Sequence, residues 1–245
     1  MIGSSSSRVV CVTVDAEPDC PPYLWGWRGM EEGAPALLDV FEDEDVPVTF
    51  FTTGETAREY PEFVERLVDD GHELGSHGMT HTPFPDLTPE AAEQEIRETS
   101  LLLRTYAPVT SFRAPNLRLP HRYLSLLEKD GYRVDSSRGK YKPAHWRPSG
   151  STSLTRMPAS VTSSWLRLPA WIRDPMLRRL KDPIVLFVHP WEFIDLTDAP
   201  IPWDCRAGTG PSALASLRST LRLYRAEGAT FVRISDAAGH PDRSR

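Results

Sequence analysis

The sequence predicts an α/β fold, a single incomplete or distorted parallel (β/α)7 barrel, in which seven strands alternate with helices. Short apolar and β-branched runs recur along the chain, and stretches with helical periodicity separate most of them. Polar residues follow five of these runs, at the strand ends where such barrels gather their active sites. An open doubly wound sheet is the alternative, although no GxGxxG or P-loop pattern supports nucleotide binding.

The expected strands are runs rich in valine, isoleucine, threonine and aromatic residues. In order, they are residues 8–14, 46–52, 72–76, 110–112, 132–134, 184–188 and 230–234. The first is almost continuously apolar, as a strand buried on both faces is, and it stops at Asp15. Residues 139–171 break the alternation with Pro, Ser and Trp, so we expect a long loop or small excursion over one end of the barrel.

The expected helices are bounded by proline and glycine. In order, they are residues 35–44, 61–70, 88–106, 120–130 and 212–227. Pro61 and Pro89 lie in first turns, where the missing N–H has no helical partner to lose. Gly71, Gly131 and Gly228 follow helix ends, which is the typical position of a terminating glycine.

Length and composition predict one globular domain over residues 8–235, with tails at 1–7 and 236–245. Of the 245 residues, 40% are hydrophobic and 25% are charged, as in an ordinary globular protein. The net charge of −6 argues against a nucleic-acid partner, which requires a clustered basic face. The basic residues within 173–181 alternate with apolar ones, which indicates that they form one side of a helix.

The three cysteines, Cys11, Cys20 and Cys205, are an odd number without CxxC spacing, so no disulfide framework is expected. The serine-rich N-terminus does not resemble a signal peptide, and no apolar run approaches the roughly 20 residues of a membrane span. We therefore expect a cytoplasmic protein in a reducing environment. The oligomeric state is not encoded in any of these patterns.

Two histidines four residues apart, His77 and His81, are the strongest chemical signal in the sequence. Acidic residues (Asp15, Glu17 and Asp19) lie at the end of the first expected strand. Two imidazoles and one carboxylate can hold a catalytic divalent metal and leave coordination positions open for water. The combination indicates a metal-dependent hydrolase.

Further polar residues are expected at the same edge of the barrel. Asp15 ends the first strand, His77 follows the third, Arg113 the fourth, Asp135 the fifth and His189 the sixth. Because parallel strands present their carboxyl ends on one face, these five side chains should converge on one site.

The motifs around these residues resemble those of the polysaccharide deacetylase family, also known as the NodB homology domain or carbohydrate esterase family 4. The resemblance covers roughly residues 8–235 and rests on five motifs in order. They are Thr-Val-Asp-Ala-Glu at 13–17, His-x-x-x-His at 77–81, Phe-Arg-Ala-Pro at 112–115, Gly-Tyr-Arg-Val-Asp-Ser-Ser at 131–137 and Phe-Val-His-Pro-Trp-Glu at 187–192. The residues within these motifs are most similar to those of deacetylases associated with exopolysaccharide assembly.

The resemblance implies a metal site and an acid–base pair. His77, His81 and an acidic residue of the first motif would hold the metal, expected to be Zn²⁺. Asp15 would be the general base that takes a proton from the attacking water. His189 would be the general acid that protonates the leaving amine.

The resemblance also implies supporting residues. Arg113 would pair with Asp15 and keep its carboxylate charged and oriented, and Asp135 would hold Arg113 or His189 in place. The oxyanion would rest against the metal and a backbone N–H, for which Asn116 is the candidate. Trp191 would either stack on a sugar ring or belong to the core.

The sequence departs from the family pattern at two positions. Many members have a second aspartate after the base, whereas this chain has Ala16 there, which cannot bind metal. The third ligand would then be Glu17 or Asp19, and strand alternation favours Glu17 because it shares a side with Asp15. Asn116 replaces an aromatic residue, so a ring contact with the substrate would be lost while the backbone N–H remains.

The expected function is removal of an acetyl group from an N-acetylated amino sugar, either within a glycan or on a nucleotide- or lipid-linked precursor. One alternative is hydrolysis of a small non-sugar amide, such as a cyclic ureide or imide, on the same barrel. Another is a catalytically silent module that binds sugar or metal. Retention of both Asp15 and His189 argues against the silent module, because binding alone requires neither a base nor an acid.

Overall fold

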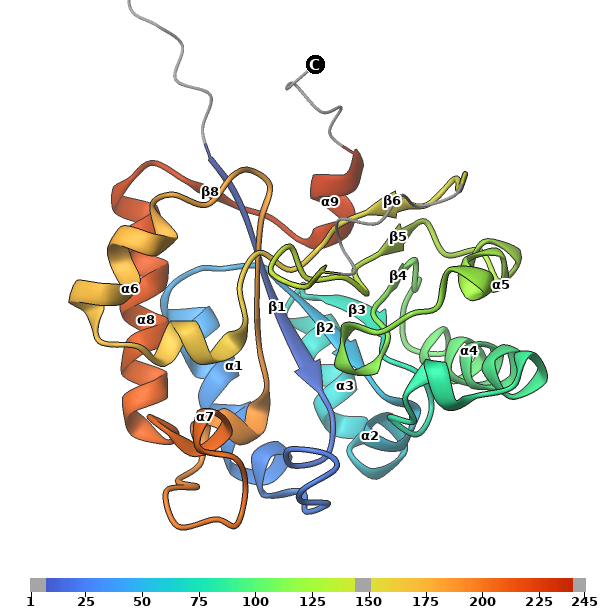
Figure 1. Ribbon diagram of the computed structural model, residues 1–245, viewed down its shortest axis with the longest axis horizontal. Coiled ribbons are helices and arrows are strands. Elements are labelled where there is room, and N and C mark those ends of the chain that lie inside the picture. The colour runs from blue at the N-terminus through green and yellow to red at the C-terminus, as the bar shows by residue number, and fades with distance from the viewer. Residues whose placement is uncertain (1–7, 144–150, 240–245) are drawn as a thin grey trace, which may run out of the picture.

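In the computed structural model, which describes residues 8–143 and 151–239, one parallel sheet rolls up inside a layer of helices (Figure 1). The strands are β1 (Val9–Ala16), β2 (Val48–Thr52), β3 (Glu73–Ser76), β4 (Ser111–Phe112), β5 (Val134–Asp135), β6 (Thr155–Arg156), β7 (Ile184–Val188) and β8 (Thr230–Phe231). Their order in the sheet is β6-β5-β4-β3-β2-β1-β7, and β8 also pairs with β1. All of these pairings are parallel, so the expected distorted parallel barrel is confirmed.

Strand β6 lies within residues 139–171, where the sequence predicted a long loop or small excursion and no strand. The prediction missed β6 because the strand has only two residues, neither of them buried, so it has no apolar run to reveal it. The chain beyond β6 then closes the barrel. The backbone N–H of Ser160 donates to the carbonyl of Val185 in β7 at 2.8 Å, and the Ser160 hydroxyl accepts from the Val185 N–H at 3.0 Å.

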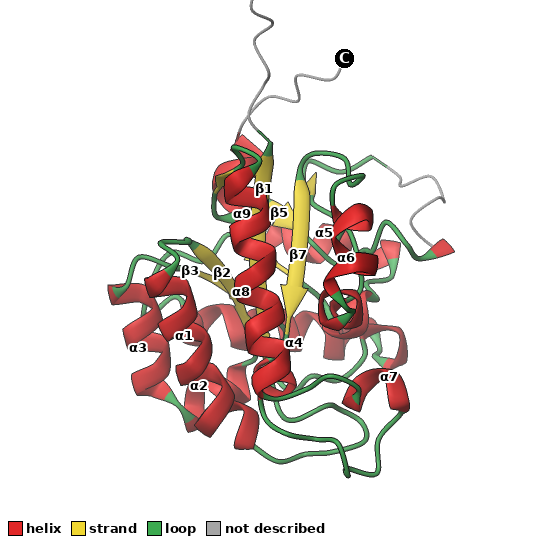
Figure 2. Ribbon diagram, turned by 90° about the vertical axis from the view of Figure 1, so that its left-hand side faces the viewer, coloured by secondary structure: helices red, strands yellow, loops and turns green. Residues whose placement is uncertain are grey.

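The helices lie outside the strands (Figure 2). They are α1 (Ala34–Asp43), α2 (Gly54–Glu59), α3 (Pro61–Asp69), α4 (Pro89–Leu103), α5 (Leu124–Lys129), α6 (Ala170–Leu177), α7 (Trp203–Arg206), α8 (Pro211–Ala226) and α9 (Ile234–Gly239). Single turns of 3₁₀ or π helix are η1 (Gly29–Gly33), η2 (Phe84–Asp86), η3 (Pro115–Leu117), η4 (His121–Tyr123), η6 (Ser163–Arg167) and η7 (Pro190–Phe193). The basic run at 173–181 is helical only to Leu177, and Arg173 is buried against α8, where it donates to Ser219.

Alternation along β1 separates two cores. Val10, Val12 and Val14 face the helices, in the large apolar cluster between sheet and helices. Cys11 faces the barrel interior and packs with Phe51 and with residues of α9. Helix α9 therefore closes the N-terminal end of the barrel, and it carries the packed part of the chain past residue 235, where the sequence predicted the domain to end.

A buried carboxylate fixes the start of α9. Glu73 in β3 accepts hydrogen bonds from Thr49 at 2.7 Å, from Ser111 at 2.5 Å and from the backbone N–H of Ser235 at 3.1 Å. A carboxylate beside the first N–H groups of a helix is favourable because those groups have no partners within the helix. In the part of the chain that the structure describes, no helix is both long and apolar enough to cross a membrane.

Candidate functional site

The five polar residues expected at strand ends lie at the C-terminal face of the barrel. Asp15 is near the end of β1, His77 directly follows β3, Arg113 follows β4, Asp135 ends β5 and His189 follows β7. A cavity of about 360 Å³ opens at this face. Six of the candidate site residues line it, namely Asp15, Glu17, His81, Asn116, His189 and Trp191.

Glu17, His77 and His81 form a buried group in which each residue offers one ligand atom and all of these atoms lie within 4.8 Å of one another. Oε2 of Glu17 is 3.1 Å from Nε2 of His77 and 2.7 Å from Nε2 of His81. Glu17 directly follows β1, and its side chain lies on the same side as that of Asp15, as alternation predicted.

The hydrogen bond of His77 fixes the position of its ring proton. Nδ1 lies 2.7 Å from the backbone carbonyl of Arg113, and because a carbonyl can only accept, Nδ1 carries the hydrogen. In neutral His77, Nε2 is then a lone-pair acceptor that faces a carboxylate oxygen of Glu17. Two acceptors at 3.1 Å repel each other unless a cation or a proton lies with them, so the donor set fits a divalent metal.

The charges in this group depend on one another. Burial would raise the pKa of the Glu17 carboxyl, but the positive charges of His81 and His189 hold that pKa well below its usual range. Burial would likewise lower the pKa of His81, and the Glu17 carboxylate raises it instead. Glu17 is therefore ionised at neutral pH and supplies the negative charge that a metal site requires.

A carboxylate from α4 holds the loop between the two histidines. Oε2 of Glu95 accepts from the backbone N–H groups of Met79 at 2.6 Å and Thr80 at 3.1 Å, and Oε1 accepts from the Thr80 hydroxyl at 2.6 Å. Gly78 has a φ of 81°, which a side chain rarely permits, and His81 has a φ of 57°. The tight turn brings both imidazoles to the same side.

Asp19 lies apart from the group around Glu17. Its Oδ1 accepts from the backbone N–H of Gly29 at 2.8 Å and its Oδ2 from that of Arg28 at 3.1 Å, at the start of η1. Burial raises the pKa of Asp19 although these hydrogen bonds lower it. The side chain is occupied in holding the loop after β1, so of the two acids that the sequence left open, the structure brings only Glu17 to the histidines.

Asp15 and Arg113 form an ion pair inside the barrel, as expected. Nη1 of Arg113 is 2.6 Å from Oδ1 of Asp15 and also donates to the Thr13 hydroxyl at 2.8 Å, while Nη2 donates to the Ser136 hydroxyl at 2.8 Å. The guanidinium lies over the ring of Phe51, with 4.2 Å from its central carbon to the ring centroid. This fully buried side chain is therefore fixed on several sides, and it fixes the Asp15 carboxylate in turn.

The expectation that Asp135 holds Arg113 or His189 needs correction. Its Oδ2 lies 2.5 Å from Nε of Arg156, and its Oδ1 accepts from the backbone N–H of Ser137. The next residue, Ser136, contacts Arg113 instead, because it directly follows β5 and its hydroxyl bridges Arg113 and the backbone carbonyl of Met157. Asp135 acts on the site only indirectly, through the backbone that carries this serine.

His189 faces Asp15 and Glu17 from across the cavity. Its Nε2 is 3.9 Å from Oδ2 of Asp15 and 3.8 Å from Oε1 of Glu17. Its Nδ1 is 2.7 Å from Oε1 of Glu192, and Glu192 forms an ion pair with Arg167. Burial alone would lower the pKa of His189, but Glu17, the hydrogen bond to Glu192 and Asp15 raise it to about 9.

Trp191 is buried and contacts two members of the site. Its indole stacks on the His189 ring, with centroids 4.8 Å apart and planes at 20°, and its Nε1 donates to Oε1 of Glu17 at 3.3 Å. One ring face is therefore covered by an imidazole rather than open to a sugar. Asn116 has a φ of 58°, and its carbonyl accepts from Nζ of Lys142 at 2.7 Å.

Several residues that position the site were not predicted from the sequence, among them Glu95, Arg167 and Glu192. Glu192 had a signal, because an acid three residues after a histidine can reach back to it as in a capping box, and the structure contains that arrangement at the start of η7. Glu95 and Arg167 carried no local signal, since their partners are distant in the chain.

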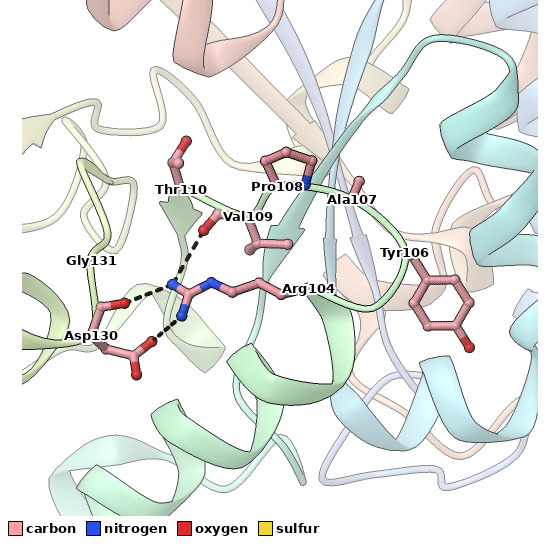
Figure 3. Close-up of a pocket in the computed structure, with 8 residues that line it drawn as sticks. All are labelled: Arg104, Tyr106, Ala107, Pro108, Val109, Thr110, Asp130 and Gly131. Carbon is pink, nitrogen blue, oxygen red and sulfur yellow. Dashed lines mark hydrogen bonds and ion pairs between the residues drawn. The ribbon is translucent and has the colours of Figure 1, made fainter.

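A larger cavity of about 570 Å³ lies away from these residues, around the loop before β4 (Figure 3). Its one basic side chain, Arg104, is already engaged: it forms an ion pair with Asp130 at 3.2 Å and donates to the carbonyls of Asp130 and Val109. These contacts brace the end of α4 against the loop after α5. The smaller cavity is the candidate site because the titratable groups converge there.

The fold and the site together define the class of this protein. It is a parallel α/β barrel with a candidate metal centre of two histidines and one carboxylate at its C-terminal face. The comparisons with known proteins then identify the family. A family model described as polysaccharide deacetylase matches residues 3–134, more than half of the chain, and the protein belongs to that family.

Individual relatives agree with this assignment. A chitooligosaccharide deacetylase of Rhizobium leguminosarum bv. trifolii is 40% identical over 107 residues, which are 42% of this chain and 43% of that protein. A peptidoglycan deacetylase of Helicobacter pylori is 27% identical over 170 residues, 68% of this chain and 55% of that protein. This chain thus matches about half the length of its curated relatives. A solved structure from Mycobacterium smegmatis shares the fold, with a TM-score of 0.72 at 20% identity over 96% of this chain and 90% of that one.

Proposed function

We propose that this protein is a metal-dependent hydrolase that removes the acetyl group from an N-acetylated amino sugar. The observation that carries the proposal is the joint position of five side chains. Glu17, His77 and His81 form a candidate metal-binding group, and Asp15 and His189 line the same cavity as Glu17 and His81. Binding alone would not need a base and an acid at these two positions.

Glu17, His77 and His81 would hold the metal through Oε2 and the two Nε2 atoms. When bound, a divalent metal, zinc in our proposal, supplies a water of lowered pKa and a positive charge for the acetyl carbonyl oxygen. The backbone N–H of Asn116 is the proposed second contact for that oxygen as it becomes negative.

Asp15 acts as the base in this proposal. Its Oδ1 is held by Arg113, which leaves Oδ2 on the side of the cavity to take the proton of the attacking water. A carboxylate fixed by a buried guanidinium needs little reorganisation during the reaction. Ser136 and Thr13 contribute by fixing Arg113.

His189 acts as the acid. Its Nδ1–H is directed at Glu192, so Nε2 is the nitrogen that faces the cavity and donates the proton to the leaving amine. The carboxylates of Glu17, Glu192 and Asp15 raise the pKa of this imidazole and thereby stabilise its protonated form. The Arg167–Glu192 ion pair keeps the ring in place.

The proposed substrate is an N-acetylhexosamine within a glycan or on a nucleotide- or lipid-linked precursor. The relatives named as chitooligosaccharide and peptidoglycan deacetylases support a glycan with N-acetyl groups. Location in the cytoplasm is part of the same proposal and would favour a precursor over mature polymer. Cell fractionation would test it.

Acetate release is the direct test. The purified protein should carry stoichiometric metal and release acetate from N-acetylhexosamine oligomers or sugar nucleotides. Asp15→Asn should abolish turnover and leave the metal content unchanged. Ring opening of a cyclic ureide without acetate release from any amino sugar would replace the substrate class, and full activity without metal would overturn the mechanism.

A further inference from the structure

Two cysteines that are distant in the chain meet at the rim of the candidate site. Cys20 lies in the loop after β1, and Cys205 lies in α7. Both line the same cavity as Glu17 and His189. Both also belong to one apolar cluster around Trp191, so the loop after β1 and the α7 segment pack against each other.

The two thiols line one cavity, pack in one apolar cluster and differ in accessibility. Cys20 is buried, whereas Cys205 is half-buried and reachable from solvent. The neighbouring thiol lowers the pKa of Cys205 and raises that of Cys20, and burial raises the pKa of Cys20 further. The accessible partner is therefore the one with the greater thiolate character, which is the typical arrangement of an attacking and a resolving thiol.

We propose that Cys20 and Cys205 form a reversible disulfide across the rim of the cavity, by exchange with a low-molecular-weight disulfide such as oxidised glutathione. The inference goes beyond the proposed hydrolase activity and does not depend on it. It requires two neighbouring thiols of unequal exposure, and neither a metal nor a substrate takes part.

The exchange proceeds in two balanced steps. The thiolate of Cys205 attacks one sulfur of oxidised glutathione, which forms a mixed disulfide and releases one glutathione thiolate that takes up a proton. Cys20 then loses its proton, attacks the sulfur of Cys205 and releases the second glutathione. Two protein thiols are oxidised to one disulfide, and one glutathione disulfide is reduced to two thiols.

The disulfide would join the two segments that carry opposite sides of the site. The loop after β1 begins at Glu17, in the metal-binding group. The backbone of Asp204, next to Cys205, accepts from Arg167 at 2.5 Å, and Arg167 pairs with Glu192, which orients His189. Oxidation therefore links the two sides of the cavity covalently and restricts the opening of its rim.

The test is to equilibrate the full chain with oxidised glutathione and count its free thiols. Two of the three cysteines should be lost, the intact mass should fall by about 2 Da, and peptide mapping should find a Cys20–Cys205 bridge that dithiothreitol reverses. Closing so long a loop should also raise the thermal midpoint, by about 5–10 °C.

Single variants separate the two steps. Cys20→Ser lacks the resolving thiol and should retain a stable glutathione adduct on Cys205, whereas Cys205→Ser should keep its remaining thiols reduced. Cys11→Ala is the matched control and should behave as wild type, because Cys11 is buried in the barrel interior, where burial raises its pKa to about 12. A persistent adduct on the wild-type protein with Cys20 still free would overturn the proposal, whatever the acetate assay gives.

Discussion

Nη1 of Arg113 donates to Oδ1 of Asp15 at 2.6 Å, and the other carboxylate oxygen, Oδ2, faces Nε2 of His189 at 3.9 Å. The two oxygens of one carboxylate therefore have different surroundings, one against a fixed cation and one toward the cavity. This division depends on a planar guanidinium that reaches Asp15 and Ser136 at the same time.

Arg113→Lys should lower kcat by about 10–100-fold while the metal content stays at the wild-type level. A lysine retains the charge but cannot reproduce the contacts to Asp15 and Ser136 together, so the base loses its fixed orientation. Steady-state kinetics with metal analysis measures this. Arg156→Lys, at an arginine that pairs with Asp135 outside the reacting group, is the matched control, and equal losses in both variants would contradict the idea.

Glu17→Gln and Asp19→Asn should have opposite consequences. Glu17→Gln removes the negative charge of the metal-binding group, so stoichiometric metal should be lost. Asp19→Asn should keep its metal and instead lose about 1–2 kcal/mol of unfolding free energy, because the side chain accepts from the backbone N–H groups of Arg28 and Gly29. Metal analysis and urea denaturation of both variants provide the comparison, and metal loss from Asp19→Asn alone would reverse the assignment.

Glu95→Gln should weaken metal binding by about 10–100-fold, as expected when a residue that positions a ligand is lost. An amide offers only one acceptor oxygen where the carboxylate uses two to hold Met79 and Thr80. Competition with a chromogenic chelator measures the affinity. Glu93→Gln, on the same helix but paired with the exposed Lys129 instead of the loop between the histidines, should leave the affinity unchanged.

His72 should make stability fall with acid. Burial lowers the pKa of His72 in the folded state, and its Nδ1 accepts from the backbone N–H of Val48 at 3.3 Å, so the neutral ring is the native form. The unfolded chain binds the proton more readily. Stability is therefore complete above the unfolded pKa of about 6.5 and declines below it, by at most about 1.4 kcal/mol per pH unit, until the folded pKa is reached.

His72→Asn keeps an acceptor near Val48 and removes the titration. Urea denaturation between about pH 5 and 7 should then show a smaller loss of unfolding free energy per pH unit than in the wild type. Identical slopes in the two proteins would mean that other groups cause the acid sensitivity.

The strand ends and the position of Glu17 on the same side as Asp15 could be predicted from the sequence because both follow from local rules. An apolar run that stops at a polar residue marks the end of a buried strand, and alternation with period two decides which side chains share a face. Those rules are sufficient to place Asp15, Glu17 and His189 at one end of the barrel.

The partners of Asp135, Glu95 and Arg167 could not be predicted, because they depend on contacts between distant segments. Asp135 and Ser136 are adjacent, and only the exact path of β5 decides which of them reaches Arg113. Strand β6 was missed for the same kind of reason: its two residues pair with β5 although nothing in their own sequence requires a strand.

Helix α9 closes the N-terminal end of the barrel, and its position affects how the chain folds during synthesis. β1 is made first, but it completes its pairing only with β7 and β8, and its inner face is covered by a helix that ends at Gly239. The segment from β1 to α9 must therefore leave the ribosome before the inner face of β1 can be buried. Until then the apolar inner face of β1 is exposed and can bind chaperones or aggregate. On a ribosome stalled before residue 239, the nascent chain would lack a complete α9, and the N-terminal end of the barrel would stay open.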